Sequence, residues 1–232
     1  MIAITSSLIA KEISKNININ VASLPSYDKL DSPVSTHADM LVCVIDDSVF
    51  VYEDYYNNNE ETFSCLGKNY KIVKVRKECK KKYPNDISLN VLVIKKKIFA
   101  RLDSVADEII DYAKENGYKL INVSQGYSAC STLVVNTNSA ITGDKGIYEA
   151  LLNEGVNALL VKNDTIKLPG YSCGFIGGAG FVFKNKAMFF GEIENHPDFL
   201  EIRDFLKNEN VDCISILKGD VYDFGGVKVL KS

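Results

Sequence analysis

The chain has 232 residues, of which 46% are hydrophobic and 25% charged, with a formal net charge of −3. This balance indicates a folded domain, and the weak negative charge does not favour a nucleic-acid partner. No apolar run is long enough to span a membrane, and no basic, apolar leader opens the chain. The sequence therefore predicts a cytoplasmic protein without membrane or nucleic-acid contacts. Because no linker-like tract divides it, we predict a single domain over residues 1–232.

A repeated unit of about 46 residues organises the chain, and such a repeat decides the fold. Each unit is expected to contain a strand hairpin, a helix and one further strand. The hairpin turns end at Ser48, Lys97, Ser139 and Lys186, which are 49, 42 and 47 residues apart. We therefore expect four complete copies and one copy that is shared between the two ends of the chain.

The first two units differ in their predicted helices. Leu8, Ile9 and Ile13 follow Ser6-Ser7 at helical spacing and predict a helix, followed by a strand over 17–22. The second unit has a hairpin over 41–51 and a strand over 70–75. Its intervening segment, 54–66, is rich in Asn and Tyr, and we predict an irregular surface excursion there in place of a helix.

The later units follow the pattern more closely. Asp103 is the expected N-cap of a helix that ends before Asn116-Gly117, and Pro197 is expected in the first turn of the last helix. The predicted hairpins, helices and strands, in chain order, are 90–100, 102–113, 119–123, 132–142, a helix around 147–151 after Gly143-Asp144, 157–161, 180–190, 199–206 and 213–217.

The fifth copy is expected where the chain ends meet. From Lys186 through the C-terminus to Ser48 there are 94 residues, which is two further periods. We predict that Gly226–Leu230 pairs with Ile2–Thr5, so that the units form a ring, as in a propeller, and not an open solenoid. The predicted fold class is α/β, a five-bladed β/α propeller of ββαβ modules closed by its terminal strands.

A ring directs equivalent residues of each unit towards one centre. Residues i and i+2 of a strand share a face, so the two positions before each hairpin strand are expected to line one pocket. The first position holds His37, Asp86, Ser128, Phe175 and Asp223, and the second holds Asp39, Ser88, Cys130, Gly177 and Gly225. Several of these side chains are titratable or nucleophilic, which is unusual for a packing layer.

His37 and Asp39 are candidate catalytic residues. A histidine held by a carboxylate is suited to general acid–base work near neutral pH. The alternative is an ordinary histidine in a loop before a strand. The other histidine, His196, precedes Pro197 at a helix start and is expected to be a capping element.

Cys130 is the best candidate nucleophile, and Cys173 is the runner-up because both lie in Gly-Tyr-Ser segments. A thiolate attacks an electrophilic carbon only when a neighbour such as His37 favours its ionised form. The alternative for Cys130 is a small, half-buried residue at a strand start. The six cysteines show no paired spacing and are expected to be thiols; we predict no metal site and no cofactor.

Asp223 and Asp86 are candidate substrate-binding carboxylates. Paired carboxylates accept the forked donors of a planar cation such as guanidinium. The alternative role is that of a turn-forming aspartate, which the neighbouring Gly and Pro residues also favour.

These residues carry a resemblance to the pentein superfamily of guanidino-group-modifying enzymes. The five-module ring is similar, as are His37-x-Asp39, Asp223-Phe-Gly-Gly226 and Ala129-Cys-Ser-Thr132. More narrowly, the chain resembles an uncharacterised bacterial group assigned that fold. The resemblance implies that a cysteine attacks the guanidinium carbon, a histidine moves protons and carboxylates hold the substrate.

The chain departs from the family's order of modules. Asp223 and His37 lie in modules five and one, which places the family's cysteine in module two, whereas Cys130 lies in module three. Two hypotheses follow. One is a cysteine-dependent hydrolase or amidinotransferase acting on a guanidino or amidine C–N bond; the other is a non-catalytic binding protein for a small ligand or a protein partner.

Overall fold

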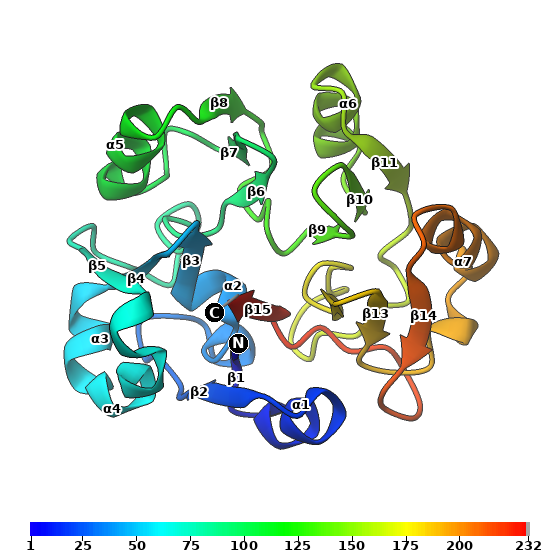
Figure 1. The fold of residues 1–232 in the computed structure, drawn as a ribbon, viewed down its shortest axis with the longest axis horizontal. Coiled ribbons are helices and arrows are strands. Elements are labelled where there is room, and N and C mark those ends of the chain that lie inside the picture. Colours follow the sequence, from blue (N-terminus) through cyan, green and yellow to red (C-terminus); the bar gives the residue numbers. More distant parts are fainter. Residues whose placement is uncertain (231–232) are drawn as a thin grey trace.

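The computed structural model describes residues 1–230 and contains five three-stranded sheets. Figure 1 shows the sheets arranged around a common centre. In each sheet an inner strand pairs antiparallel with a middle strand, which pairs parallel with an outer strand. In the order inner, middle, outer, the sheets are β15 (Val227–Leu230), β1 (Ile2–Ser6) and β2 (Asn20–Leu24); β3 (Val42–Ile45), β4 (Ser48–Tyr52) and β5 (Lys71–Val75); β6 (Leu92–Ile94), β7 (Lys97–Ala100) and β8 (Lys119–Asn122); β9 (Thr132–Val134), β10 (Ser139–Thr142) and β11 (Asn157–Leu160); and β12 (Gly180–Phe183), β13 (Lys186–Phe189) and β14 (Asp212–Ser215).

A helix joins the middle strand of each sheet to its outer strand, because parallel neighbours need a crossover connection. These connections lie on the outside of the ring (Figure 1). They are α1 (Ala10–Ile17), the group α3 (Glu53–Asn58), α4 (Glu60–Phe63) and η2 (Ser64–Asn69), then α5 (Asp107–Glu115), α6 (Lys145–Asn153) and α7 (Phe199–Asn208). Two short helices, η1 (Ser32–Val34) and α2 (Ala38–Leu41), lie between β2 and β3, and η3 (Ile193–Asn195) precedes α7 in the last crossover.

Four of the crossover helices, α1, α5, α6 and α7, each bury one apolar stripe against the sheet. The buried pairs are four residues apart, which places both members on one helix face. They are Ile13 and Ile17 in α1, Ile109 and Ala113 in α5, Ile147 and Leu151 in α6, and Ile202 and Leu206 in α7 (α5 and α6 differ in sequence but share this spacing). These residues form a core between the sheets and the outer helices. The inner strands lie on the opposite side of the sheets, around the centre of the ring (Figure 1).

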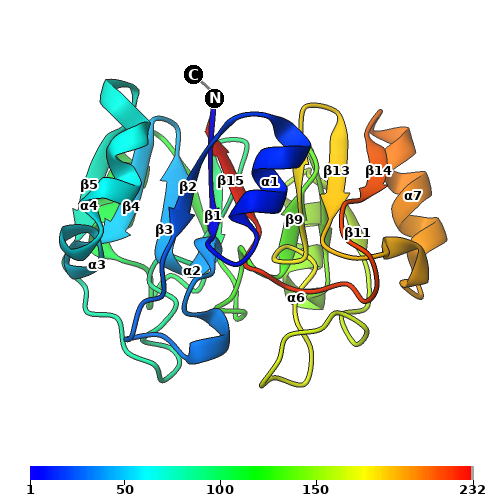
Figure 2. The same ribbon diagram turned by 90° about the horizontal axis from the view of Figure 1, so that it is seen from below.

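The predicted pairing of the terminal strands is confirmed. β1 and β15 are antiparallel, with Ile2 opposite Leu230 and Thr5 opposite Val227. Figure 2 shows the chain ends on one side of the ring and α2 on the other. This arrangement gives the ring two distinct sides, one with the hairpin turns and termini and one with the loops that precede the inner strands.

The segment predicted as an irregular excursion is helical, and that prediction was wrong. α3 and α4 occupy most of 54–66, and Tyr55 and Phe63 are buried with their ring centroids 6.4 Å apart. These aromatic anchors hold a segment whose Asn residues have weak helix propensity, so tertiary packing overrides the local preference.

Two predicted helix starts also need correction. Helix α5 begins at Asp107 with Ala106 as its N-cap residue, whereas Asp103 accepts hydrogen bonds from Ser104 and Arg101. Pro197 lies before the first turn of α7, because the N-cap residue is Asp198. Among the described residues, no helix is long and apolar enough to cross a membrane.

Candidate functional site

A buried polar cluster lies where three of the inner strands begin. His37 is the N-cap residue of the four-residue helix α2 and Asp39 lies in its first turn, directly before β3. Cys130 precedes β9 and Asp223 precedes β15. The exposed fractions are 2% for His37, 1% for Asp39, 4% for Cys130 and 3% for Asp223. Ionisable groups are almost never buried so completely without a partner, so this cluster is the first candidate for a site.

His37 lies between two carboxylates. Its Nδ1 atom is 3.9 Å from Asp39 Oδ1 and 3.7 Å from Asp223 Oδ1. Burial lowers the pKa of His37, and the nearby Asp39 carboxylate acts in the opposite direction. The net direction favours the neutral imidazole at pH 7, which is the form that accepts a proton.

Asp39 is the least satisfied group of the cluster. Both carboxylate oxygens are buried and neither has a hydrogen-bond partner of normal geometry in the described chain. Burial raises the pKa of Asp39; the neighbouring Asp223 acts in the same direction, while His37, Lys228 and the Cys130 thiol oppose the shift. An unpaired buried carboxylate costs free energy, so this position is suited to a bound cation or proton.

Asp223 is held by the backbone around it. The amide of Phe175 donates to Oδ2 and the amide of Gly225 donates to Oδ1, each at 2.9 Å. Burial raises the pKa of Asp223 to about 6, against the lowering effect of these two hydrogen bonds. The carboxylate is therefore fixed in position and close to its titration point near neutral pH.

Asn90 holds Cys130 in place. Its Nδ2 donates to Cys130 Sγ at 2.9 Å and to the Asp39 carbonyl at 3.0 Å, and its Oδ1 accepts from the Ala129 amide at 2.8 Å. Burial raises the pKa of Cys130 well above its usual value, with Asp39 and Asp223 adding to the effect and Asn90 opposing it. Without a bound cation, the thiol is therefore protonated.

Sequence reasoning missed Asn90. The residue opens the predicted hairpin 90–100, whereas in the structure it lies just before β6. A polar residue at the start of an apolar run was the only available signal, and its partners lie 40 and 51 residues away along the chain.

Two glycines allow the backbone to approach the cluster closely. A Cβ atom on Gly178 would lie 1.9 Å from Asp223 Oδ1, so no larger residue fits there. Gly225 has φ of +79°, and its Cβ would lie 2.4 Å from His37 Cβ. The Gly-rich segment of the fourth module thus has a steric role beside the site.

Asp86 and Cys173 lie apart from the four clustered residues. Asp86 is buried, burial raises its pKa, and its Oδ2 accepts from Tyr127 Oη at 2.7 Å, while Oδ1 has no partner in the described chain. The Tyr127 ring lies 6.1 Å from that of Phe175, whose amide binds Asp223. Tyr127 and Phe175 thus connect Asp86 to the cluster.

Cys173 is half-exposed in the loop between β11 and β12. Within residues 1–230 it forms no hydrogen bond with a residue of the cluster. His37 and Cys130 also share no hydrogen bond in that range; Asp39 neighbours both of them. The structure therefore brings together four of the six predicted site residues, with Asp39 at the centre.

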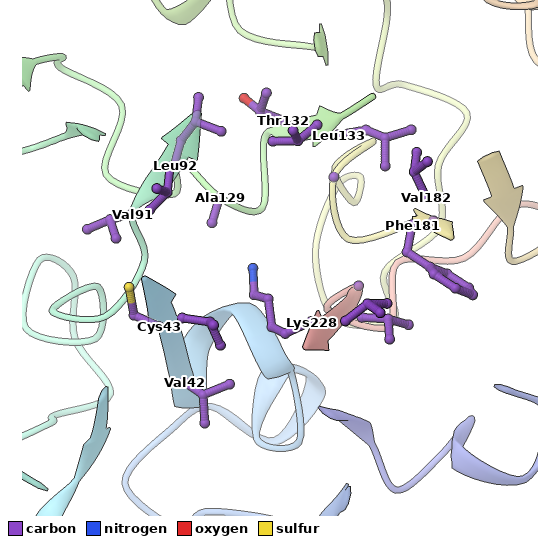
Figure 3. A pocket seen from close by; sticks show the side chains of 18 residues that line it. Val42, Cys43, Val91, Leu92, Ala129, Thr132, Leu133, Phe181, Val182 and Lys228 are labelled. Carbon is purple, nitrogen blue, oxygen red and sulfur yellow. The ribbon is translucent and has the colours of Figure 1, made fainter. Parts of the chain in front are cut away.

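A cavity of about 300 Å³ adjoins the cluster on the side of the hairpin turns (Figure 3). Ala129, which precedes Cys130 in the chain, and Gly226, which follows the Gly225 that binds Asp223, contribute to its wall. Figure 3 shows the side chain of Lys228 extending into it. Within residues 1–230, no group of three or more His, Cys, Asp or Glu side chains is arranged to hold a metal ion.

Solved structures with the same architecture have very different sequences. DDAH from Pseudomonas aeruginosa matches with a TM-score of 0.56 and 8% identity, covering 93% of this chain and 91% of that one. An amidinotransferase from Microseira wollei matches at 0.54 and 10%, covering 97% and 82%. Agmatine deiminase from C. jejuni matches at 0.55 and 9%, covering 93% and 86%. These neighbours are guanidino-modifying enzymes, and at such identities the likeness shows the fold.

The fold defines the class: this is a pentein-fold protein, as the resemblance implied. Within that class, the chain belongs to a family described as "Family of unknown function (DUF6873)", whose model matches residues 4–228. No curated protein matches the chain.

Proposed function

We propose that this protein is a cysteine-dependent enzyme that acts on a C–N bond of a guanidino or amidine group, as a hydrolase or an amidinotransferase. The observation that carries the proposal is the pair of unpartnered oxygens on Asp39, buried beside Asp223, His37 and Cys130. Two carboxylates and a nucleophile around one point suit a planar cation whose carbon is electrophilic.

The charges of the cluster favour such a substrate. Two carboxylates face a histidine that burial keeps neutral. A guanidinium or amidinium ion presents forked N–H donors, which match carboxylate oxygens in geometry and charge. Its arrival would return Asp39 and Asp223 to their ionised forms, because a nearby cation lowers a carboxyl pKa.

The same cation favours ionisation of the Cys130 thiol. Asp39 and Asp223 raise the pKa of Cys130 in the unliganded protein, and a bound cation offsets their charge. The thiol proton passes to the neutral His37, with Asp39 between the two residues, and the thiolate attacks the central carbon to form a C–S bond. The imidazolium then protonates the departing amine as its C–N bond breaks.

The second half of the reaction decides the enzyme type. In a hydrolase, water attacks the carbon, His37 takes the proton of that water, and the C–S bond breaks to give a ureido or amide product and the free thiol. In an amidinotransferase, an acceptor amine replaces water. Asp39 and Asp223 hold the cation in either case, and Asn90 fixes the sulfur through its 2.9 Å hydrogen bond.

The comparisons support the proposal at the level of the reaction class. Hydrolase, amidinotransferase and deiminase neighbours share the fold, and their reactions all involve guanidino compounds. Asp86 and Cys173 are proposed as outer substrate contacts, reached past Tyr127 and Phe175 on the loop side of the cluster.

The test is a panel of guanidino and amidine compounds, with assays for ammonia, released amine and ureido products, and with added acceptor amines. We expect turnover by the parent protein and at least about a hundredfold loss in Cys130→Ser and His37→Ala. Cys213→Ser is the matched control, because Cys213 lies in the outer strand β14, away from the cluster. Full activity of Cys130→Ser would rule out the thiol as the nucleophile. No turnover of any compound in the panel by the parent protein would refute the proposed enzymatic activity.

One observation favours the second candidate, a binding protein. Cys130 is buried with a strongly raised pKa, and the rings of Tyr127 and Phe175 lie near the cluster. A protein of this kind would bind a small cation or a protein partner without consuming it. Saturable binding of a guanidino compound by the parent protein and by Cys130→Ser alike, without product, would support this candidate.

A further inference from the structure

The inner strands of the ring surround a second region that the proposed chemistry does not use. β3, β6, β9, β12 and β15 are each the edge strand of their sheet. Each pairs on one side only, and its other side faces the centre (Figure 1). Backbone N–H and C=O groups that the sheets leave unpaired therefore border the central cavity, where they can bind a polar ligand group.

The side chains of the cavity wall are mostly apolar. Every inner strand contributes a half-buried valine at the corresponding position, and all five line the cavity: Val44, Val93, Val134, Val182 and Val229. The cavity volume is about 300 Å³. A space of this size and character accommodates a small ligand with an apolar body.

Lys228 is the only charged residue among those that line the cavity. Its side chain extends into the space from β15 (Figure 3) and is half-buried. In the described part of the chain, its ammonium group forms no hydrogen bond and no ion pair within 4.0 Å. The charge of Lys228 acts to lower the pKa of the Asp39 carboxyl, but Asp39 is 1% exposed and does not line the cavity.

The outer mouth of the cavity is also basic. A second cavity of about 550 Å³ lies at the hairpin turns and shares Val93, Val134, Val182 and Val229 with the first. Lys95 and Lys184 contribute to its wall, and no Asp or Glu among the described residues lines either cavity. Among the described residues, the charged side chains that line the two cavities are all lysines, and such a path attracts anions.

We propose that the central cavity binds a small aliphatic monocarboxylate, with its carboxylate on Lys228 and its hydrocarbon body against the ring of valines. One ammonium group balances the single charge of a carboxylate, whereas a phosphate dianion would keep a second, unbalanced charge inside the cavity. The unpaired backbone amides of the inner strands supply further donors to the carboxylate. This site is separate from the proposed catalysis and does not need the Cys130 thiol.

The test measures binding of 3-methylbutanoate to the full chain by titration calorimetry, beside its uncharged analogue 3-methylbutanamide. We expect the carboxylate to bind at least about tenfold more tightly than the amide, because only the carboxylate pairs with the ammonium group. Lys228→Met should weaken carboxylate binding at least about tenfold. Lys71→Met is the matched control, since Lys71 is an exposed strand lysine on the outer strand β5.

Several results would overturn the proposal. They are no carboxylate binding by the parent protein, equal binding of the amide, or unchanged binding in Lys228→Met. The ligand comparison uses the parent protein, so it decides the question even where the variant fails to fold. Cys130→Ser should bind the carboxylate as the parent does, which separates this site from the proposed active site.

Discussion

The two histidines of this protein are both buried, yet their surroundings differ completely. His196 is 4% exposed, and both ring nitrogens are used: Nε2 lies 2.9 Å from the Lys162 carbonyl, and Nδ1 accepts from the Asp198 amide at 3.1 Å. His37 is 2% exposed; its ring forms no hydrogen bond with a described residue, and its Nδ1 atom lies 3.7 Å from Asp223 Oδ1 and 3.9 Å from Asp39 Oδ1. A histidine whose ring nitrogens are both hydrogen-bonded is typical of a structural role, whereas one without such bonds beside an unpaired carboxylate is typical of a functional site.

The comparison extends to the residues around each histidine. The His196 region joins η3 to α7 with backbone hydrogen bonds, so its polar groups serve the chain itself. The His37 region leaves the oxygens of Asp39 without donors and holds Asp223 and Cys130 by Gly225, Phe175 and Asn90. The polar groups around His196 therefore hydrogen-bond to the chain itself, whereas the Asp39 oxygens beside His37 are free to bind a ligand.

Exchanging each histidine for alanine tests the comparison most severely. His37→Ala should lower turnover of a guanidino substrate about a hundredfold or more and leave the fold intact, since general acid–base groups contribute rates of that size. His196→Ala should keep the turnover number and lower the free energy of unfolding by about 1–3 kcal/mol, because it leaves buried backbone groups unpaired. Steady-state kinetics and chemical denaturation measure both. The reverse pattern would show that His37 is the structural histidine.

A methyl group at Gly178 tests the steric closeness of the site. Gly178→Ala places a Cβ atom 1.9 Å from Asp223 Oδ1, so the backbone or the carboxylate must move. We expect a loss of about 3 kcal/mol in unfolding free energy, at the upper end for overpacked sites, together with loss of substrate binding. Gly146→Ala in α6 is the control, because its Cβ meets nothing closer than 3.3 Å. Equal, small effects of the two changes would show that the loop adapts freely.

Titration of Asp223 makes the free energy of unfolding depend on pH, and the sign of this dependence follows from the direction of its pKa shift. Its pKa rises from 3.8 in the unfolded chain to about 6 in the folded protein. Between these values the unfolded chain binds fewer protons at this group, so the contribution of Asp223 to stability is greatest below about pH 4 and falls as the pH rises through 6, by up to about 3 kcal/mol. Denaturation curves from pH 4 to 7, compared with those of Asp223→Asn, isolate this contribution. A parent curve that does not fall more steeply than that of the variant would contradict the shifted pKa.

Asp39→Asn should give the smallest change in stability, and it should be favourable. The amide removes a buried group whose ionised form has no partner, so we expect a gain of about 1–2 kcal/mol in unfolding free energy at pH 8. Cation binding should be lost in the same variant. Thermal unfolding with and without a guanidino ligand records both effects. A destabilised variant would show that Asp39 already has the interactions it needs, as His196 does.

Much of the ring could be predicted from the sequence, because hairpin strands and tight turns leave a local pattern. The predicted pairing of Ile2–Thr5 with Gly226–Leu230 follows from the spacing of the other turns, and β1 pairs with Val227–Leu230. The helices α3 and α4 could not be predicted in this way, since Asn residues hide the two aromatic anchors Tyr55 and Phe63 that hold them. Local preference is a weak guide where a few buried side chains decide the structure.

The candidate site was only partly visible in the sequence. The repeat placed His37, Asp39, Cys130 and Asp223 at equivalent positions, which is a property of the ring. The hydrogen bonds of Asn90 depend on how three modules meet at the centre, and no spacing along the chain reports that. The same holds for Lys228, which reads as one more polar residue of an alternating strand until the cavity around it is seen.

The central claim is that Cys130 and its carboxylates form a site for a planar cation. The most direct test is alkylation by 2-chloroacetamidine, a planar cation, beside the neutral 2-chloroacetamide, with the labelled cysteines assigned by mass spectrometry. The exposed Cys65 reports the intrinsic reactivity of each reagent. The account predicts that, relative to Cys65, Cys130 reacts at least about tenfold faster with the cation, and that Asp39→Asn removes this preference. Equal relative rates for the two reagents, or a Cys130 that neither reagent labels, would contradict it.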